Sequence, residues 1–255
     1  MKEVITNTRV SDVKEIDNIY PSYSFFYKSD KIKVRGFIMF PQEIKDKMPV
    51  IFINRGGTGE HGIVTEQSIK NYNPFVQAGF ITVFSQYRGC NGGEGIDRMG
   101  GDDVFDVINI YEVISRIPFA DTARIGMWGA SRGGMMTFQV MVRVPWVKAA
   151  VVVCPIVDEV HMAKWRPGWK EHQIDTYGGS FQEQIKRSPI YWADQIPKIP
   201  IIFFAGAKDD RTDATKTIEM AEKISAPITV FPDDGHYIAP KTIQSSIEFF
   251  IKNLV

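Results

Sequence analysis

The sequence predicts an α/β domain whose doubly wound, mostly parallel sheet is covered by helices on both faces. Three observations lead to this prediction. Short apolar runs bounded by turn residues recur along the chain, as buried strands do. Most of these runs are continuous rather than alternating, which is typical of parallel strands. Segments with helical spacing separate them, and a length of 255 residues fits one such domain, spanning residues 1–255.

Strands and helices are predicted to alternate through most of the chain. The strands are expected at residues 33–40, 50–54, 80–85, 124–128, 149–154, 201–205 and 228–231. Helices are expected at residues 63–78, 132–144, 213–225 and 240–253. A further helix begins at Asp102 and Asp103, whose carboxylates suit the N-terminal end of a helix, and keeps one apolar face as far as Ile114.

Residues 157–198 break this alternation. The stretch lacks a strong strand and is rich in aromatic residues. We expect an insertion over the carboxyl ends of the strands, where open α/β sheets bind their ligands. Trp165, Trp169 and Tyr177 are the candidates for a hydrophobic substrate-binding subsite. The alternative is that these side chains only pack the insertion onto the body of the protein.

The composition excludes several kinds of partner. Lys plus Arg and Asp plus Glu both number 30, so no excess of positive charge favours binding to nucleic acid or to an anionic membrane. We therefore expect a small molecule or a short peptide as ligand. Cys90 and Cys154 are too few for a disulfide framework and suit a reducing compartment. The first 12 residues lack a signal-peptide core, and no apolar run reaches membrane-spanning length, so we predict a cytoplasmic protein.

A candidate nucleophile lies in the sequence Gly129-Ala130-Ser131-Arg132-Gly133. The motif follows the predicted strand 124–128 and precedes a predicted helix, which is the strand–turn–helix context that a GxSxG nucleophile requires. Its glycines permit a sharp turn that lifts the serine hydroxyl out of the sheet. The alternative is a glycine-rich turn with a purely structural role. The context favours Ser131 as the nucleophile.

A serine hydroxyl needs a neighbouring base, and His236 is the best placed of four histidines. It follows the predicted strand 228–231 and precedes the last helix, whereas His61 comes before the serine. His161 and His172 lie in the insertion. A nucleophile followed by an acid and then a histidine is the order found in the α/β-hydrolase fold.

The acid of such a triad should follow a strand that lies between the serine and the histidine. Asp209 meets this requirement, because it comes just after the predicted strand 201–205. Asp210 and Asp213 are rivals, since one loop presents all three carboxylates. We favour Asp209.

Stabilising an oxyanion needs two N–H donors near the nucleophile. The backbone of Arg132 would supply one, and Gly56 or Gly57, just after the predicted strand 50–54, would supply the other. The glycines around them complete no nucleotide-binding motif, and no cluster of histidines and cysteines has the spacing of a metal site. We therefore expect neither a cofactor nor a metal ion.

From about Lys33 to the C-terminus, the chain resembles the catalytic domain of the prolyl oligopeptidase family of serine peptidases. The similar motifs, in family order, are Gln86-Tyr87-Arg88-Gly89, Gly100-Gly101-Asp102-Asp103-Val104, Arg124-Ile125-Gly126, Arg187-Ser188-Pro189 and Lys208-Asp209-Asp210-Arg211. The resemblance implies that Asp209 is the triad acid and that Arg55, Gly56 and Gly57 lie at the oxyanion site. Arg55 stands where the family often has tyrosine or histidine, and we expect it to contact the substrate. Since only about 30 residues precede the similar region, we expect no β-propeller of the kind that larger family members carry.

These residues together predict a serine hydrolase that forms an acyl-enzyme on Ser131 and cleaves a peptide, amide or ester bond. The resemblance favours a peptidase. A carboxylesterase acting on small acyl esters is the alternative, because fold and triad alone do not select the substrate. A binding protein on a hydrolase fold is a distant alternative, since all three triad residues are present.

Overall fold

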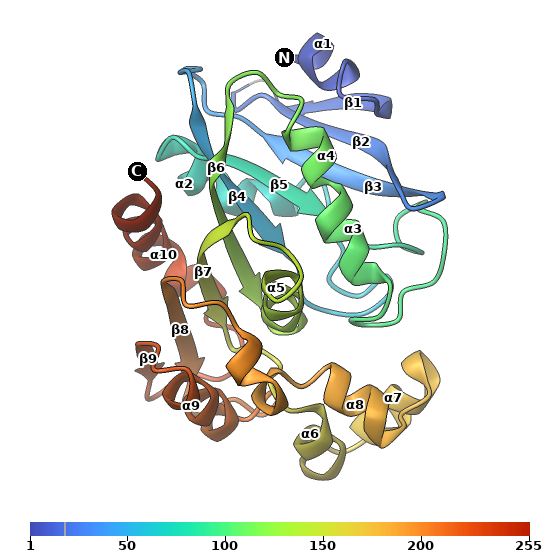
Figure 1. The fold of residues 1–255 in the computed structure, drawn as a ribbon, viewed down its shortest axis with the longest axis vertical. Helices are drawn as coiled ribbons and strands as arrows, with labels where there is room; N and C mark the ends of the chain where they lie inside the picture. The colour runs from blue at the N-terminus through green and yellow to red at the C-terminus, as the bar shows by residue number, and fades with distance from the viewer. Residues whose placement is uncertain (18) are drawn as a thin grey trace.

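The computed structural model describes residues 1–17 and 19–255, through which one nine-stranded sheet runs (Figure 1). The strands are β1 (Ser11–Asp17), β2 (Ser22–Ser29), β3 (Ile32–Met39), β4 (Met48–Asn54), β5 (Ile81–Ser85), β6 (Ala120–Ala130), β7 (Val147–Val153), β8 (Ile201–Gly206) and β9 (Ile228–Phe231). Their order across the sheet is β1-β2-β3-β5-β4-β6-β7-β8-β9.

Most of the sheet is parallel, as the sequence predicts. Strands β5, β4, β6, β7, β8 and β9 pair in parallel, whereas β1, β2 and β3 form an antiparallel edge that joins β5. The carboxyl ends of the parallel strands therefore meet at one edge, and in Figure 1 the arrows of β4, β7 and β8 point to the lower end of the molecule. This edge carries the loops that build the site.

Helices cover both faces of the sheet. The α-helices are α1 (Lys2–Thr6), α2 (Asn73–Gln77), α3 (Asp103–Asn109), α4 (Tyr111–Ile114), α5 (Arg132–Met141), α6 (Glu159–Trp165), α7 (Trp169–Tyr177), α8 (Phe181–Lys186), α9 (Ala214–Lys223) and α10 (Ala239–Leu254). Short 3₁₀ helices cover Ser68–Tyr72, Pro189–Tyr191 and Ala193–Gln195. In the described residues, no helix has the length and apolar character needed to cross a membrane.

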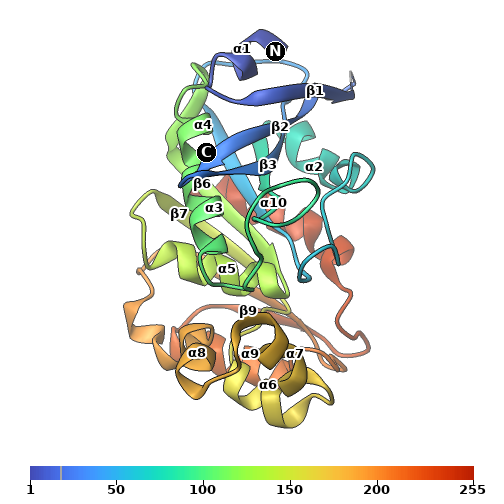
Figure 2. The ribbon, with the colours of Figure 1, turned by 90° about the vertical axis from the view of Figure 1, so that its right-hand side faces the viewer.

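Two apolar cores fill the space between the sheet and these helices. Helices α3, α4 and α5 contribute to the core on one face, for example through Phe138, while α2 and α10 contribute to the other through Phe75 and Phe250. Figure 2 shows α3 and α5 on one side of the sheet and α2 on the other. Burial on both faces explains why the central strands read as continuous apolar runs.

Two strands at the antiparallel edge escape the sequence prediction. β1 is rich in charge and largely exposed, and β2 carries buried serines among its aromatic residues. Neither has a continuous apolar run. The turn between β2 and β3 is easier to recognise in the sequence than the strands themselves. Its aspartate, Asp30, lies in a two-residue hairpin loop and adopts a positive φ of 53°, which aspartate tolerates in such loops.

The helix expected at residues 63–78 is much shorter than predicted. Only the 3₁₀ turn Ser68–Tyr72 and helix α2 form there, and α2 begins around Pro74. Proline fits the first turn of a helix but not its interior, so it marks a helix start at this position. The residues from Arg55 to Gln67 form a loop beside the site instead.

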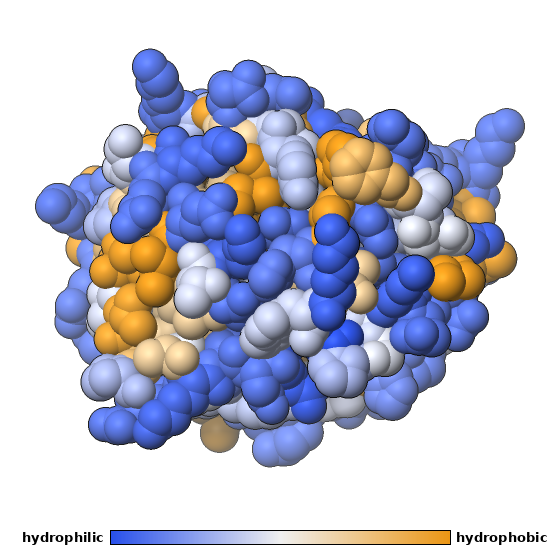
Figure 3. Space-filling view, turned by 90° about the horizontal axis from the view of Figure 1, so that it is seen from below, coloured by the Kyte–Doolittle hydropathy of each residue, from blue (hydrophilic) through white to orange (hydrophobic). Residues whose placement is uncertain are grey.

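The insertion predicted at residues 157–198 is helical. It holds α6, α7 and α8 between β7 and β8, and lies at the lower end of the molecule in Figures 1 and 2. Seen from below, this end of the surface is mainly hydrophilic, with hydrophobic side chains gathered in separate patches (Figure 3). The insertion covers the edge of the sheet at which the carboxyl ends of the parallel strands meet, as the sequence predicts.

Candidate active site

Ser131 occupies a strained turn between β6 and α5. Its φ of 56° and ψ of −124° are rare for a residue with a side chain and cost energy that the surroundings must offset. The turn requires the two glycines of the motif. A Cβ atom on Gly129 would lie 2.2 Å from the carbonyl oxygen of Gly133, and one on Gly133 would lie 1.9 Å from that of Asn54. The sequence motif thus adopts the expected nucleophile geometry.

His236 and Asp209 form a hydrogen-bonded pair at the same edge of the sheet. His236 Nδ1 lies 2.8 Å from Asp209 Oδ2. Asp209 Oδ1 accepts the backbone N–H groups of Arg211 and Thr212 at 2.8 and 3.1 Å. Burial alone would raise the pKa of Asp209, but the hydrogen bonds from His236 and from these donors hold it well below its usual range. The carboxylate therefore stays charged beside the imidazole.

The two rival carboxylates of this loop face elsewhere. Asp210 is exposed, and Asp213 caps α9 by accepting the N–H of Thr215. Asp213 Oδ2 also lies 2.7 Å from His161 Nε2. Of the three carboxylates, Asp209 is the one bonded to His236.

A pocket of about 770 Å³ brings the predicted nucleophile and the predicted base together. Ser131 and His236 both line it. The hydrogen bonds of the described residues do not include one between Ser131 Oγ and His236, and such bonds often tighten only when substrate binds. Because Nδ1 of His236 faces Asp209, Nε2 is the nitrogen left to face the pocket.

The three expected oxyanion residues also line this pocket. Arg132 is the first residue of α5, so its N–H has no carbonyl one turn earlier in the helix. Gly56 packs on the nucleophile, since a Cβ atom there would lie 3.4 Å from Ser131 Cβ. Gly57 has a φ of +72°, and a Cβ atom there would lie 2.1 Å from the carbonyl oxygen of His61. The loop thus needs glycine at Gly57 to approach the site.

Of the four residues expected to bind substrate, Trp169 alone lies on the pocket wall. Trp165 is 37% exposed and stacks on His161 outside the pocket. Tyr177 is buried, and its hydroxyl donates to Glu159. These two positions correct the expectation, because helical spacing does not reveal which face of a short helix turns to the pocket.

Arg55 is also corrected. Its side chain is buried and donates to four backbone carbonyls, those of Gly56, Gly59, His61 and Gln86. It holds the loop after β4 from behind and does not line the pocket. A guanidinium with its donors already used in this way is not free to bind a substrate.

Glu159 is a site residue that the sequence does not reveal. Its carboxylate is fully buried and accepts hydrogen bonds from Trp169, Gln173 and Tyr177, all on α7. Burial raises the pKa of Glu159. The contact fixes α7, and with it the pocket wall at Trp169. The three donors come together around the carboxylate of Glu159 only when the insertion is folded, so the sequence alone does not reveal this cluster.

Cys154 lies close to the Asp209–His236 pair. The three side chains place potential metal-ligand atoms within 4.8 Å of one another, which the distant sequence positions do not suggest. Burial raises the pKa of the Cys154 thiol to about 12, which keeps it protonated beside the pair near neutral pH. His236 and Asp209 are hydrogen-bonded to each other at 2.8 Å, as the base and acid of a triad are.

The fold and this arrangement define the class of the protein, which is a serine hydrolase with the α/β-hydrolase fold. The model of the prolyl oligopeptidase family matches residues 65–254. The chain therefore belongs to the prolyl oligopeptidase family.

Curated relatives carry peptidase names. The chain is 26% identical to the uncharacterized peptidase YtmA of Bacillus subtilis over 231 residues, which cover 86% of this chain and 87% of that protein. It is 23% identical to a putative dipeptidyl aminopeptidase of Schizosaccharomyces pombe, over 80% of this chain and 27% of that protein.

Solved structures share the fold. An acylaminoacyl peptidase of Pyrococcus horikoshii superposes with a TM-score of 0.80 at 23% identity, over 93% of this chain and 42% of that one. Porphyromonas gingivalis dipeptidyl peptidase 4 superposes with a TM-score of 0.75 at 18% identity, over 93% and 36%. The chain thus spans less than half of the length of these structures.

Proposed function

We propose that this protein is a peptidase-like serine hydrolase that cleaves a peptide or amide bond through an acyl-enzyme on Ser131. The observation that carries the proposal is the Asp209–His236 pair at 2.8 Å, whose histidine lines the same pocket as a serine held in the strained turn. In this role His236 is the general base and Asp209 orients it.

The reaction follows from the positions of these groups. Nε2 of His236 takes the proton of Ser131 Oγ, and the oxygen attacks the acyl carbon. The backbone N–H groups of Arg132 and of Gly56 or Gly57 stabilise the oxyanion. His236 then gives its proton to the leaving group. Water attacks the acyl-enzyme in a second cycle that regenerates the serine.

The pocket supports a small molecule or a short peptide as substrate, because its volume of about 770 Å³ is typical of such sites. A related solved structure is an acylaminoacyl peptidase in complex with Z-Gly-Gly-Phe-chloromethyl ketone, with a TM-score of 0.79 to this chain. Cys90 and Cys154 are free and buried, which supports a cytoplasmic location for the protein.

Hydrolysis of a matched pair of chromogenic substrates tests the proposal. The pair consists of an N-acetyl aminoacyl p-nitroanilide and the corresponding p-nitrophenyl ester. Turnover of both by the wild type supports a peptidase, because the amide has the poorer leaving group. Turnover of the ester alone would move the protein to the carboxylesterases. Absence of turnover of both, in a folded protein, would contradict the proposal.

Trp169 is expected to set the preference for bulky acyl groups. Trp169→Ala should raise KM for p-nitrophenyl octanoate by about tenfold, because it removes a large apolar surface from the pocket wall. KM for p-nitrophenyl acetate should change little. Trp165→Ala is the matched control, since this tryptophan lies outside the pocket. Equal effects of the two variants on both esters would remove Trp169 from the acyl subsite.

The charge of the pocket predicts a preference for anionic substrates. Arg166 and Arg211 line it above the rings of Trp169 and Tyr237, and no aspartate or glutamate is among the described lining residues. The wild type should therefore have a lower KM for p-nitrophenyl hemisuccinate than for the neutral p-nitrophenyl butyrate.

The two arginines can be tested separately. Arg166→Gln and Arg211→Gln should each raise KM for the hemisuccinate by about threefold to fivefold, because a partly exposed ion pair contributes about that much to binding. KM for the butyrate should stay unchanged in both variants. Lys164→Gln, on an exposed residue outside the lining, is the control. A wild type with equal KM values for the two esters would refute the charge preference.

A further inference from the structure

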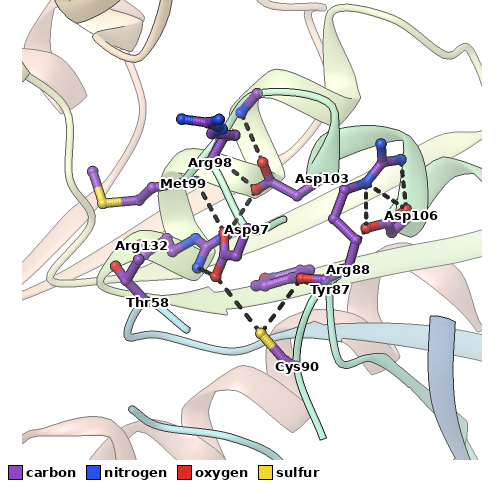
Figure 4. A network of polar contacts seen from close by, with 12 residues as sticks. Thr58, Tyr87, Arg88, Cys90, Asp97, Arg98, Met99, Asp103, Asp106 and Arg132 are labelled. Carbon is purple, nitrogen blue, oxygen red and sulfur yellow. Dashed lines mark hydrogen bonds and ion pairs between the residues drawn. The ribbon is translucent and has the colours of Figure 1, made fainter. Parts of the chain in front are cut away.

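A buried polar network lies behind the loop that follows β4. Tyr87, just after β5, is fully buried, and two guanidinium groups pack on its ring, with the carbon of Arg55 at 4.8 Å and that of Arg132 at 4.4 Å from the ring centroid. Asp97 binds Arg132 through both carboxylate oxygens at 2.6 and 2.7 Å, and Asp103 binds it at 2.7 Å (Figure 4). Two buried carboxylates thus balance two buried guanidiniums, which makes their burial tolerable.

This network holds the backbone of the loop at three successive carbonyls. The Tyr87 hydroxyl donates to the carbonyl of Arg55 at 3.2 Å. The side chain of Arg55 donates to the carbonyl of Gly56 at 3.1 Å, and that of Arg132 donates to the carbonyl of Gly57 at 2.8 Å. The orientation of each of these three peptide groups is therefore fixed by a hydrogen bond from a side chain of the buried network.

The orientation of a carbonyl determines that of the N–H in the same peptide. In a trans peptide the two groups point in opposite directions. Because the carbonyl of Arg55 points to Tyr87, the N–H of Gly56 points away from the network. Gly56 packs on Ser131, and no hydrogen bond of the described residues uses the N–H of Gly56. This N–H is therefore available at the nucleophile.

Tyr87 itself is held in a costly conformation. Its φ of 65° is rare for a bulky residue, and its N–H donates to Ser85 Oγ at 3.2 Å. Such strain persists only where the surroundings impose it and is concentrated at functional sites. Burial raises the pKa of Tyr87 well above its usual range, so the hydroxyl stays protonated and remains a donor.

We propose that Tyr87, whose ring packs against Arg55 and Arg132, is a positioning residue that aims the N–H of Gly56 at the oxyanion. The hydroxyl acts through the backbone and does not touch the substrate. This inference rests on the proposed function, because it assumes an oxyanion at Ser131. It assigns a role to the Gln86-Tyr87-Arg88-Gly89 segment, which the triad does not use.

Tyr87→Phe tests the inference, because it removes one hydroxyl and keeps the ring that the two arginines pack on. With p-nitrophenyl acetate, kcat should fall by about tenfold while KM stays within about twofold, since only the transition state carries the oxyanion. The inhibition constant of a short alkyl trifluoromethyl ketone, which forms a tetrahedral adduct with the serine, should rise by a similar factor.

Tyr27→Phe is the matched control. Tyr27 is also buried, and its hydroxyl donates to the backbone carbonyl of Asp106 at 2.7 Å and lies 2.8 Å from Ser85 Oγ. The variant therefore removes a buried hydroxyl close to Tyr87 but leaves the hydrogen bond to the carbonyl of Arg55 in place. This variant should lose a similar amount of thermal stability but keep kcat within about twofold of the wild type. If Tyr87→Phe and Tyr27→Phe lowered kcat equally, the role of Tyr87 would be only structural and the inference would be overturned.

Two further outcomes separate this inference from the proposed function. An active wild type whose kcat is unchanged in a folded Tyr87→Phe variant would overturn the positioning role alone. A wild type that neither turns over the ester nor binds the ketone would overturn both. If Tyr87→Phe did not fold, Asp97→Asn would serve, because it loosens Arg132, which packs on the Tyr87 ring at 4.4 Å from the centroid, and should give the same loss of kcat with unchanged KM.

Discussion

Ser131→Ala is expected to lower kcat for a short acyl ester by about 10⁴-fold or more. Removal of the nucleophile prevents the acyl-enzyme from forming, and the remaining activity comes only from substrate binding and the oxyanion donors. KM should change little, because the hydroxyl adds almost nothing to substrate binding. Steady-state hydrolysis of the p-nitrophenyl ester measures both constants.

The control for this variant is Ser115→Ala, which changes an exposed serine after α4 and should keep the wild-type kcat. A fluorophosphonate probe gives a second readout, since it should label the wild type and Ser115→Ala but not Ser131→Ala. A Ser131→Ala protein that kept the wild-type kcat after repurification would overturn the mechanism.

Asp209→Asn is expected to lower kcat by about 10⁴-fold as well. The carboxylate accepts the hydrogen bond of His236 Nδ1 and stabilises the charge that this ring acquires during the reaction. An amide at this position has lost the negative charge and can donate to Nδ1, which favours the wrong tautomer. Steady-state hydrolysis of p-nitrophenyl acetate by the variant and the wild type measures this loss.

Asp213→Asn is the matched control for Asp209→Asn. Asp213 lies in the same loop but pairs with His161, and asparagine caps a helix about as well as aspartate. Its kcat should stay within about threefold of the wild type. A large loss in Asp213→Asn combined with a small loss in Asp209→Asn would transfer the role of the acid to Asp213.

Family membership and the site leave the choice of substrate to experiment. The peptidase names belong to relatives that are at most 26% identical among those compared above, and the solved structures establish the fold. The pocket residues Trp169, Arg166 and Arg211 are features of this chain, so they give the sharpest tests of what it hydrolyses. We expect them to favour an anionic acyl group or a peptide carboxylate.

Much of the fold was predictable because it depends on local patterns. Continuous apolar runs identify strands buried on both faces, and the GxSxG motif identifies the turn after β6, since both are set by residues close together in the chain. β1 and β2 were missed for the same reason. An exposed, charged edge strand and a strand with buried serines have no local apolar signal.

The sequence by itself determined the fold class, the family and the order of Ser131, an acidic loop after residue 205, and His236. Only the tertiary structure decided which neighbours meet, namely Asp209 rather than Asp213 at His236, and Trp169 rather than Trp165 at the pocket. The physical reason is that periodicity records which side chains are buried, whereas the contacts between distant loops depend on how the strands are ordered in the sheet.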